Sequence, residues 1–590
     1  MSGVVGYWGA ASGAQSKDLI NKCTEAARGV GTSGFVYPRP HSNFNKAAAY
    51  GIAWWGDNSY FERRGRVGFT ASLSASGIPG AADIRIEIEA GQLTLSRDAF
   101  GRATLYWTQV DEVVWFSSRL DILLAIVEAR EVSLAGLYGY GCFSFVPAPL
   151  TPVENVFAVS AGSKMTWRAG ESEARGPVLP AIERTTEFLE PERAVVDEAG
   201  AILRLRGLLE ALIRRQLEHL PAGPVGVFLS GGLDSSITAA LLVRAGVSVR
   251  AYTLDFGAFG FSELPFAELV ADALSIPLVK VPATPREIHN AIEPTAMALD
   301  TPFGDGVTAP LFLLSRAASR DTNVVFNGEG GDQLFGGWTN KPLIASSVYG
   351  DHNPNGGDFE REYLRTFHRL HGYEQSTYAE GLQQSIARLH PFDWLADALD
   401  ASFTRSLLHR LRRANLMIKG AQNIQPRATA LGLAHGLAVR TPFCDRALAE
   451  WTFEVAGELH LRGPCEKYLL KRAVEDWLPA EIVWREKRGM GVPLTSWCLG
   501  PLWRAAGDWL TPGALESEGR FQPDLALRIA SGRFSGHVQG RRIGEILWLL
   551  LMWEAWRKTV LKEHHKPSYL NSHWLPARWL QWRVSGAENL

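Results

Sequence analysis

The chemistry of this chain begins at a short turn of serines, glycines and one aspartate. Residues 230–236 read Ser-Gly-Gly-Leu-Asp-Ser-Ser; an apolar run, 225–229, precedes them and a helical pattern follows. Two glycines allow a tight turn and close approach of a ligand. Serine hydroxyls and the unpaired N–H groups of a helix start can cradle an anion. A carboxylate beside a phosphate repels it unless a cation intervenes, so Asp234 predicts a magnesium ion held with the phosphate.

This turn is not a Walker loop, because GxxxxGK[ST] is absent from the chain. The residues that we assign to the phosphate and nucleotide site in this turn are Ser230, Gly231, Gly232, Asp234, Ser235 and Ser236.

A second glycine-rich segment carries two carboxylates. Residues 327–337 read Asn-Gly-Glu-Gly-Gly-Asp-Gln-Leu-Phe-Gly-Gly and follow a strand-like run, 323–327. Its glycines indicate close approach of the backbone to a ligand at the carboxyl edge of a sheet, where α/β folds bind nucleotides. We therefore assign Asn327 and Gly328 to the nucleotide site, together with Leu254, which lies near the end of the strand-like run 247–255.

Both segments resemble known signatures. Residues 230–236 are similar to the pyrophosphate-binding motif of the N-type ATP pyrophosphatases, which cleave ATP between the α and β phosphates. Residues 327–337 resemble the asparagine-synthetase pattern (S/T)GEGxDE(L/F)FGGY, with Gln333 in place of a usual glutamate. The resemblance implies ATP and Mg²⁺ as cofactors, Asp332 as a magnesium ligand beside Asp234, and Glu329 as the base or orienting group for an attacking amine.

Two further segments extend the resemblance to the asparagine-synthetase family. Residues 440–445, Arg-Thr-Pro-Phe-Cys-Asp, are similar to its EvRvPFLD motif, with Cys444 for leucine and Ala438 for glutamate. Residues 479–497 are similar to LPxxIxxRxKxGFxxP. This similarity places Lys487 on the family's lysine, whose cation would stabilise charge that develops in the transition state.

The first part of the chain resembles the glutaminase domain of the same family but lacks its catalytic groups. Residues 98–107, 117–124 and 151–163 follow the trace of that domain. Where the family has a cysteine nucleophile at position 2, this chain has Ser2, and the RHRGPD and NGEIYN motifs are absent. A serine hydroxyl is a much weaker nucleophile than a thiolate. We therefore expect no hydrolysis of glutamine.

Two kinds of relative share this loss, the lasso-peptide cyclases and the β-lactam synthetases. Both activate a carboxylate with ATP and let an amine of the same molecule attack it, so that effective concentration replaces a supply of ammonia. The expected function is an ATP-dependent amide-bond synthetase of this kind, similar to a lasso-peptide macrolactam cyclase. Its substrate would be a carboxylate, with a peptide as one candidate, and companion leader-binding and protease proteins would be its partners.

Three alternatives remain open. An asparagine synthetase could use ammonia, or glutamine, with aspartate. A non-catalytic scaffold would have lost the aspartates or the lysine, yet all are present. Other adenylating chemistry such as sulfur transfer would favour paired or exposed cysteines, and the five here are scattered.

The strands and helices that the sequence predicts must hold these motif residues in place. At 590 residues two or three domains are expected. Residues 1–175 are β-rich, which fits a degenerate glutaminase-like domain of the Ntn-hydrolase type; 176–198, rich in Pro, Glu and Arg, is the expected linker. In 199–560 strands and helices alternate, which predicts a doubly wound parallel sheet and a helical C-terminal part. Residues 561–590 are expected to be a tail.

The net charge, apolar runs and cysteine spacing of the chain indicate which partners and which compartment to expect. A net charge of -2 gives no electrostatic reason for a nucleic-acid partner or an acidic membrane surface. The longest apolar run, 546–553, is too short to span a bilayer and predicts a buried helix. No signal peptide is evident at the start, and no CxxC pair is present, so we expect a cytoplasmic protein with reduced thiols. The oligomeric state is left open.

Overall fold

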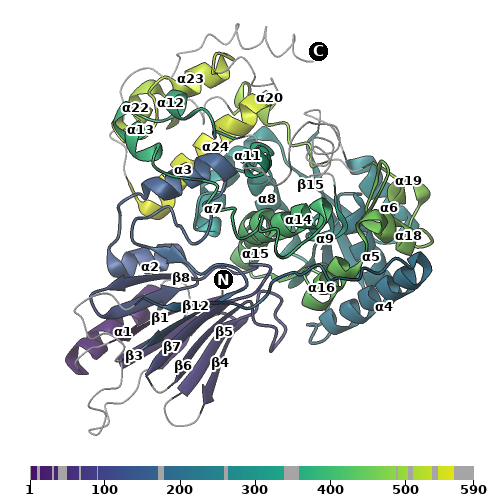
Figure 1. The fold of residues 1–590 in the computed structure, drawn as a ribbon, viewed down its shortest axis with the longest axis horizontal. Coiled ribbons are helices and arrows are strands. Elements are labelled where there is room, and N and C mark those ends of the chain that lie inside the picture. Colours follow the sequence, from purple (N-terminus) through teal and green to yellow (C-terminus); the bar gives the residue numbers. More distant parts are fainter. Residues whose placement is uncertain are drawn as a thin grey trace.

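The computed structural model is an α/β protein with a β-rich N-terminal unit, a parallel sheet and a helical C-terminal part (Figure 1). The fold class expected from the sequence is therefore confirmed. No helix in the described part of the chain is both long and apolar enough to cross a membrane. The structure describes residues 2–9, 13–28, 32–36, 49–64, 68–89, 91–169, 179–257, 263–337, 358–367, 369–486, 489–502, 509–534 and 542–563.

Two antiparallel sheets of six strands each form the N-terminal unit. The first, in spatial order, contains β10 (Phe157–Ala158), β8 (Tyr106–Val110), β9 (Val113–Ser117), β1 (Gly3–Gly9), β3 (Ala49–Trp55) and β2 (Thr32–Val36). The second contains β12 (Ala181–Arg184), β11 (Ser163–Arg168), β7 (Gln92–Arg97), β6 (Ile84–Glu89), β5 (Gly68–Leu73) and β4 (Ser59–Arg64).

Period-two alternation fixes which face of each strand is buried. In β6 the side chains of Ile84, Ile86 and Ile88 are buried in the core between the two sheets, whereas Arg85 and Glu87 are only half-buried. The opposite face of the first sheet packs against α1 (Gly13–Arg28) and α2 (Leu120–Val127). This layered arrangement is what positions the loops that reach the synthetase sheet.

The segment expected to be a linker, 176–198, is structured where it is described. It contains β12, which pairs with β11 and completes the second sheet. Further along, the Val195 N–H donates to the Glu454 carbonyl at 2.7 Å. Its proline-rich composition therefore marks an extended segment that is packed along both units rather than a free tether.

A five-stranded parallel sheet forms the centre of the second unit. Its spatial order is β15 (Leu278–Pro282), β14 (Val249–Asp255), β13 (Val225–Phe228), β16 (Val324–Phe326) and β17 (Ala438–Arg440). The chain builds outward from β13 in one direction and then returns to continue on its other side. This order makes the gap between β13 and β16 the switch point of a doubly wound sheet, where ligands bind beyond the carboxyl ends of the strands.

Helices cover both faces of this sheet. One face packs against α4 (Glu198–Gln216), α5 (Leu233–Arg244) and α6 (Leu264–Leu274). The other face packs against α7 (Pro285–Leu299), α8 (Thr308–Ala318) and α15 (Gln425–Ala434). Because its strands are buried on both sides, they are continuous apolar runs, as in Val225 to Phe228.

The C-terminal part is mainly helical. Its elements are α9 (Gly331–Phe335), α11 (Asp358–Arg365), α12 (Glu374–Thr377), α13 (Glu380–Ile386), α14 (Leu407–Ala414), the π-helix η2 (Asn415–Ile424), α16 (Arg446–Glu454), α17 (Gly457–His460), β18 (Leu461–Arg462), β19 (Cys465–Glu466), α18 (Tyr468–Val474), α19 (Ala480–Val483), α20 (Leu494–Cys498), α22 (Pro512–Glu518), α23 (Leu525–Ala530), α24 (Ile543–Trp556) and the π-helix η4 (Arg557–Leu561). Every residue of α24 except Glu545 is buried, as its apolar sequence predicts.

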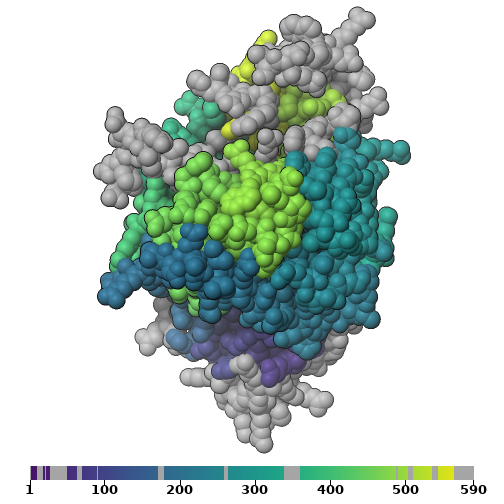
Figure 2. Space-filling view, turned by 90° about the vertical axis from the view of Figure 1, so that its right-hand side faces the viewer, coloured from purple at the N-terminus to yellow at the C-terminus, as the bar shows by residue number. Residues whose placement is uncertain are grey.

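Figure 2 shows how the elements after β17 close one side of the molecule. The light-green segment that includes α18 and α19 lies against helix α4, in blue, and against the teal residues that follow α4 in the chain. This segment returns from the C-terminal part to the edge where β13 ends, and it brings residues far apart in sequence to one place.

The N-terminal unit is joined to the second unit by buried polar contacts. The Val439 N–H donates to the Ala75 carbonyl at 2.7 Å, and Arg440 Nε donates to the Ser76 carbonyl at 3.0 Å. A helix of the first unit, α3 (Leu134–Phe143), is buried among the C-terminal helices, where the Tyr140 hydroxyl donates to the Leu549 carbonyl at 2.7 Å. The two units therefore share a core.

We predict that a fragment starting near residue 199 does not fold into a stable protein. Removing the first unit would expose the apolar surfaces that pack on α3 and would leave the buried Arg440 without its Ser76 acceptor. Size-exclusion chromatography and circular dichroism of the purified fragment test this. A monomeric fragment with cooperative unfolding would contradict it.

A buried polar cluster links α14 to the segment after α16. Arg412 Nη1 lies 2.7 Å from His409 Nδ1, and Nη2 donates to the Thr452 hydroxyl at 2.7 Å. His460 Nε2 lies 2.9 Å from the Thr452 carbonyl oxygen. Burial, and then the Arg412 guanidinium, lower the pKa of His409 to about 3 and that of His460 well below its usual value.

We predict that the protein loses stability as the pH falls below about 6.5, because both histidines are held neutral in the fold while the unfolded chain takes up protons. Each histidine should cost about 2 kcal/mol of the free energy of unfolding near pH 5. Thermal unfolding of wild type and His409→Asn near pH 7 and near pH 5 measures this. The variant should show the smaller acid shift, and equal shifts would argue against the assignment.

Candidate active site

The turn of residues 230–236 connects the end of β13 to α5 at the switch point of the parallel sheet. Gly231 has a φ of 72°, and a Cβ there would lie 2.5 Å from the backbone of Phe266, so glycine is required. The Gly232 N–H donates to Ser230 Oγ at 3.2 Å, and the Ser235 hydroxyl donates to the Gly232 carbonyl at 3.0 Å. The serines thus fix the conformation of the turn.

Helix α5 begins in this turn in a way suited to an anion. Its N-cap is Gly232, and no side chain caps the helix start. The first N–H groups of the helix, and its positive dipole end, can then be used by a phosphate. Ser235 and Ser236 are both buried here, and the Ser236 hydroxyl donates to the Gly232 carbonyl at 2.8 Å.

The second glycine-rich segment interlocks with the first. A Cβ on Gly328 would lie 2.5 Å from the Ser235 nitrogen, and a Cβ on Gly331 would lie 2.5 Å from the Asp234 carboxylate. The Glu329 N–H donates to Asn327 Oδ1 at 3.1 Å, which holds the loop after β16 in place. The glycines predicted to allow close approach therefore allow one loop to approach the other, with Glu329 beside the turn.

Asp234 and Asp332 converge, as the sequence predicts, and a lysine lies between them. Lys467 Nζ is 2.7 and 2.6 Å from the two oxygens of Asp234 and 2.6 Å from Asp332 Oδ1. The lysine is 2% exposed and has a left-handed backbone with a φ of 53°. Sequence analysis missed Lys467, because it lies more than 130 residues beyond Asp332 and no spacing rule connects them.

The two aspartates are better suited to a magnesium ion that arrives with ATP than to a metal ion that stays bound to the protein. Carboxylate oxygens are hard ligands of the kind that Mg²⁺ prefers, and Mg²⁺ usually takes one or two carboxylates together with phosphate oxygens and water. In the described part of the chain, no group of three or more His, Cys, Asp and Glu residues could hold a metal ion. Asp234 and Asp332 would therefore hold magnesium that arrives with the phosphates of ATP.

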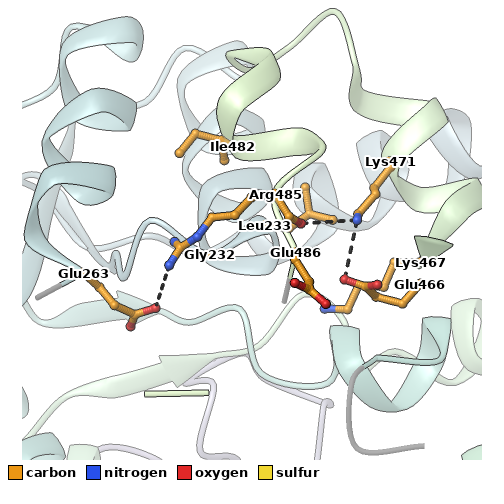
Figure 3. Close-up of a pocket in the computed structure, with 9 residues that line it drawn as sticks. All are labelled: Gly232, Leu233, Glu263, Glu466, Lys467, Lys471, Ile482, Arg485 and Glu486. Carbon is orange, nitrogen blue, oxygen red and sulfur yellow. Dashed lines mark hydrogen bonds and ion pairs between the residues drawn. The ribbon is translucent and has the colours of Figure 1, made fainter. Parts of the chain in front are cut away.

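A small pocket opens beside the start of α5. Figure 3 shows Lys467, Lys471 and Arg485 on its wall, together with Glu263, Glu466 and Glu486. Each basic group is fixed: Lys471 Nζ lies 3.6 Å from Glu466 Oε1, and the Arg485 guanidinium stacks 3.6 Å above the Phe266 ring. The pocket joins the phosphate turn to the segment that precedes residue 487.

The other predicted site residues fall into two groups. Leu254 lies near the carboxyl end of β14, beside the strand that leads into the phosphate turn, so it borders the nucleotide edge. Lys487 lies outside the described residues, although its neighbours Arg485 and Glu486 line the pocket. The lysine that the structure places on the two aspartates is therefore Lys467, and the role given to Lys487 remains a prediction.

A second set of charges lies near Asp332, on the side of η2. Arg427 Nη1 is 2.7 Å from Asp305 Oδ2. Burial opposes ionisation of Asp305, but Arg427, Arg369 and Lys419 together bring its pKa down to about 2. Burial lowers the pKa of Lys419. The nearby carboxylates of Asp305 and Asp332 act in the opposite direction and raise it. This wall of the site, which sequence analysis did not find, carries more basic than acidic side chains.

Comparison with known proteins identifies the family. The family model described as asparagine synthase matches residues 204–558, which is more than half of the chain. The chain belongs to the asparagine synthase family.

The relatives agree with this placement. Asparagine synthetase 1 of Bacillus subtilis is 24% identical over 81% of this chain and 77% of its own length. A putative asparagine synthetase of Mycobacterium bovis is 27% identical over 69% of this chain and 66% of its own. Amidase chry2 of Gibberella zeae is 25% identical over 72% and 71%. As a member of this family, the protein is an ATP-dependent carbon–nitrogen ligase.

The position of the family's glutaminase nucleophile is occupied by Ser2. Its Oγ accepts a hydrogen bond from the Asn58 N–H at 3.1 Å. Behind it, a Cβ on Gly3 would lie 2.3 Å from the Trp55 ring, so the chain is tightly packed at this point. Ser2 therefore accepts a hydrogen bond at the tightly packed start of β1, and its side chain is a hydroxyl where the family has a thiol.

The cysteines of the described chain are free and mostly buried, as expected. Cys444, which replaces a leucine of the family motif, lies behind the active site, and its thiol donates to the Glu329 carbonyl at 3.9 Å. Burial raises the pKa of the Cys444 thiol well above its usual value, so it stays neutral. A neutral, buried thiol is a poor nucleophile, which disfavours sulfur chemistry at this site.

We predict that Asp234→Asn and Asp332→Asn each lower ATP-dependent pyrophosphate release by roughly 100-fold or more, because each change removes a charged ligand for the magnesium of the nucleotide. An exposed aspartate on α6, Asp272, supplies the matched control. Asp272→Asn should keep the wild-type rate. Near wild-type turnover in either active-site variant would mean that the two aspartates do not hold the metal.

Proposed function

We propose that this protein adenylates a carboxylate with ATP and lets an amine of its substrate capture the activated acid, as a lasso-peptide macrolactam cyclase does. The observation that supports this best is the convergence of Asp234, Asp332 and Lys467 on the phosphate turn. Each element of adenylation chemistry has a counterpart there: hydrogen-bond donors for phosphate, two ligands for magnesium and one lysine.

The proposed reaction has two steps. A carboxylate oxygen attacks the α-phosphorus of ATP and the bond to the β-phosphate breaks, which gives an acyl-adenylate and pyrophosphate. The start of α5 would hold the departing pyrophosphate, and Lys467 would offset its growing negative charge. Magnesium, when bound, neutralises further phosphate charge. An amine then attacks the acyl carbon, AMP leaves, and Glu329 accepts the proton that the amine loses.

The acid substrate would lie between the phosphate turn and η2. Lys419, Arg427 and Arg369 give this side an excess of positive charge over Asp305 and Glu545. Such a wall favours an anionic substrate, since it attracts a carboxylate to the α-phosphate of the nucleotide. It supports a carboxylate as the substrate and does not by itself choose between a free amino acid and a peptide.

The amine source follows from the N-terminal unit. Ser2 and the missing glutamine-binding motifs argue against ammonia released from glutamine. An amine on the substrate itself would be presented at high effective concentration. A peptide substrate of this kind would reach the enzyme with the help of leader-binding and protease proteins in the cytoplasm.

A second candidate is asparagine synthesis from aspartate and ammonia. The names of the Bacillus and Mycobacterium relatives favour it. Those relatives are described as glutamine-hydrolysing, whereas Ser2 argues against that activity here, so the candidate would need free ammonia. A scaffold without catalysis is disfavoured, because both aspartates and Lys467 are in place.

We predict that pyrophosphate and AMP form when a suitable acid is supplied, and that the enzyme forms no glutamate from glutamine. Ser2→Ala should leave amide synthesis unchanged, because Ser2 takes no part in it. Pyrophosphate release measured over a panel of free amino acids and peptides bearing an acidic side chain and a free amine identifies the substrate. Mass spectrometry then identifies the product.

Two outcomes contradict the proposal. ADP and orthophosphate as products would exclude an adenylate. Turnover that depends on aspartate and ammonia, with none on any amine-bearing peptide, would favour the second candidate.

A further inference from the structure

The Lys467 ammonium is held by both magnesium-binding carboxylates at once. Its nitrogen is 2.6 Å from the nearer oxygen of Asp234 and 2.6 Å from Asp332 Oδ1. These are short, charge-assisted contacts, and the lysine is 2% exposed. Lys467 therefore neutralises two carboxylates that are brought together from the first turns of α5 and α9.

A magnesium ion bound to both aspartates needs the same space. Magnesium binds oxygen at about 2.0–2.1 Å, so an ion shared by the two carboxylates would lie where the lysine nitrogen lies now. The ammonium and the ion cannot both be there. Only the side chain has to move, because Lys467 starts helix α18 and its neighbour Glu466 is held 3.6 Å from Lys471.

We propose that Lys467 is a built-in counterion that magnesium displaces, and that this exchange couples metal binding to nucleotide binding. This inference rests on the proposed function only in taking Asp234 and Asp332 as the metal site. Without a nucleotide, the displaced ammonium would give up both aspartates inside a buried site, which is costly. With ATP bound, the phosphates on the adjacent turn offer the ammonium a new partner, so the lysine moves from the aspartates to the charge it must stabilise.

The exchange would have a functional consequence. Free magnesium alone would bind poorly, and the aspartates would stay ordered by Lys467 until the nucleotide arrives with its ion. Arrival of the ion would then release the lysine into the reaction site, so that the catalytic cation is in place only when the metal is. Metal loading and placement of the lysine would be a single event.

Binding of Mn²⁺ to protein that contains no nucleotide tests the proposal, because the electron paramagnetic resonance signal of free Mn²⁺ reports binding without any turnover. Wild type should bind Mn²⁺ weakly, and Lys467→Met should bind it about tenfold more tightly or better, since the competing ammonium is gone. Adding α,β-methylene-ATP, which cannot form an adenylate, should tighten Mn²⁺ binding to wild type by a similar factor and to the variant by much less, once the Mn²⁺ bound by the analogue without protein is subtracted.

Three variants separate this effect from simple charge removal or misfolding. Lys467→Arg keeps the cation and should keep weak metal binding. Lys164→Met removes a surface lysine on β11 that pairs with Glu183 in the N-terminal unit, and it should bind Mn²⁺ as wild type does. The double variant Lys467→Met with Asp332→Asn should not show the tighter Mn²⁺ binding of Lys467→Met, because it lacks the Asp332 carboxylate.

The proposal is overturned if folded Lys467→Met binds Mn²⁺ no more tightly than wild type. If that variant does not fold, Mn²⁺ binding to wild type tests the proposal instead. Wild type that binds Mn²⁺ equally tightly with and without the ATP analogue would overturn it. These results are independent of the ligase assay. Wild type that releases no pyrophosphate with any acid, next to a variant that gains Mn²⁺ affinity, would refute the proposed function and leave the exchange standing.

Discussion

The contact of one buried lysine with two carboxylates organises the active site. Asp234 comes from the first turn of α5, Asp332 from the first turn of α9 and Lys467 from the N-cap of α18. Like charges this close would repel each other strongly in a buried setting, so the two loops can lie together only if a cation neutralises them. The glycines that let the loops interlock, Gly328 and Gly331, are useful only because this neutralisation exists.

The same logic explains why the returning C-terminal segment matters. Residues after β17 leave the parallel sheet, pass through α16 and α17, and come back to the start of α5, where β13 ends. They supply Lys467, Lys471 and Arg485 to the pocket beside α5 (Figure 3). A nucleotide site at a switch point normally uses the first strand–helix turn. Here a distant segment completes it with the positive charge that the turn lacks.

The N-terminal unit keeps a structural role that is separable from glutamine chemistry. Its Ala75 and Ser76 carbonyls pair with β17 and Arg440, and α3 lies within the C-terminal helices. This shared core gives the unit a structural role whatever its chemistry, because removing it would open the second unit as well. The proposed use of a substrate amine fits an enzyme in which this unit supports the fold and delivers no ammonia.

The sequence by itself determined the local features. The phosphate turn, the second glycine-rich loop and the alternation of strands and helices follow from glycines and strand-like runs, because these are set by neighbours in the chain. The pairing of Asp234 with Asp332 was expected only because both segments resemble motifs of the asparagine-synthetase family. The tertiary structure alone decided that β12 joins the second sheet, that α3 leaves the first unit, and that Lys467 completes the site. The last two outcomes depend on contacts between residues more than 130 positions apart, such as Lys467 with Asp332 and Tyr140 with Leu549, and no periodicity or spacing in the sequence encodes them.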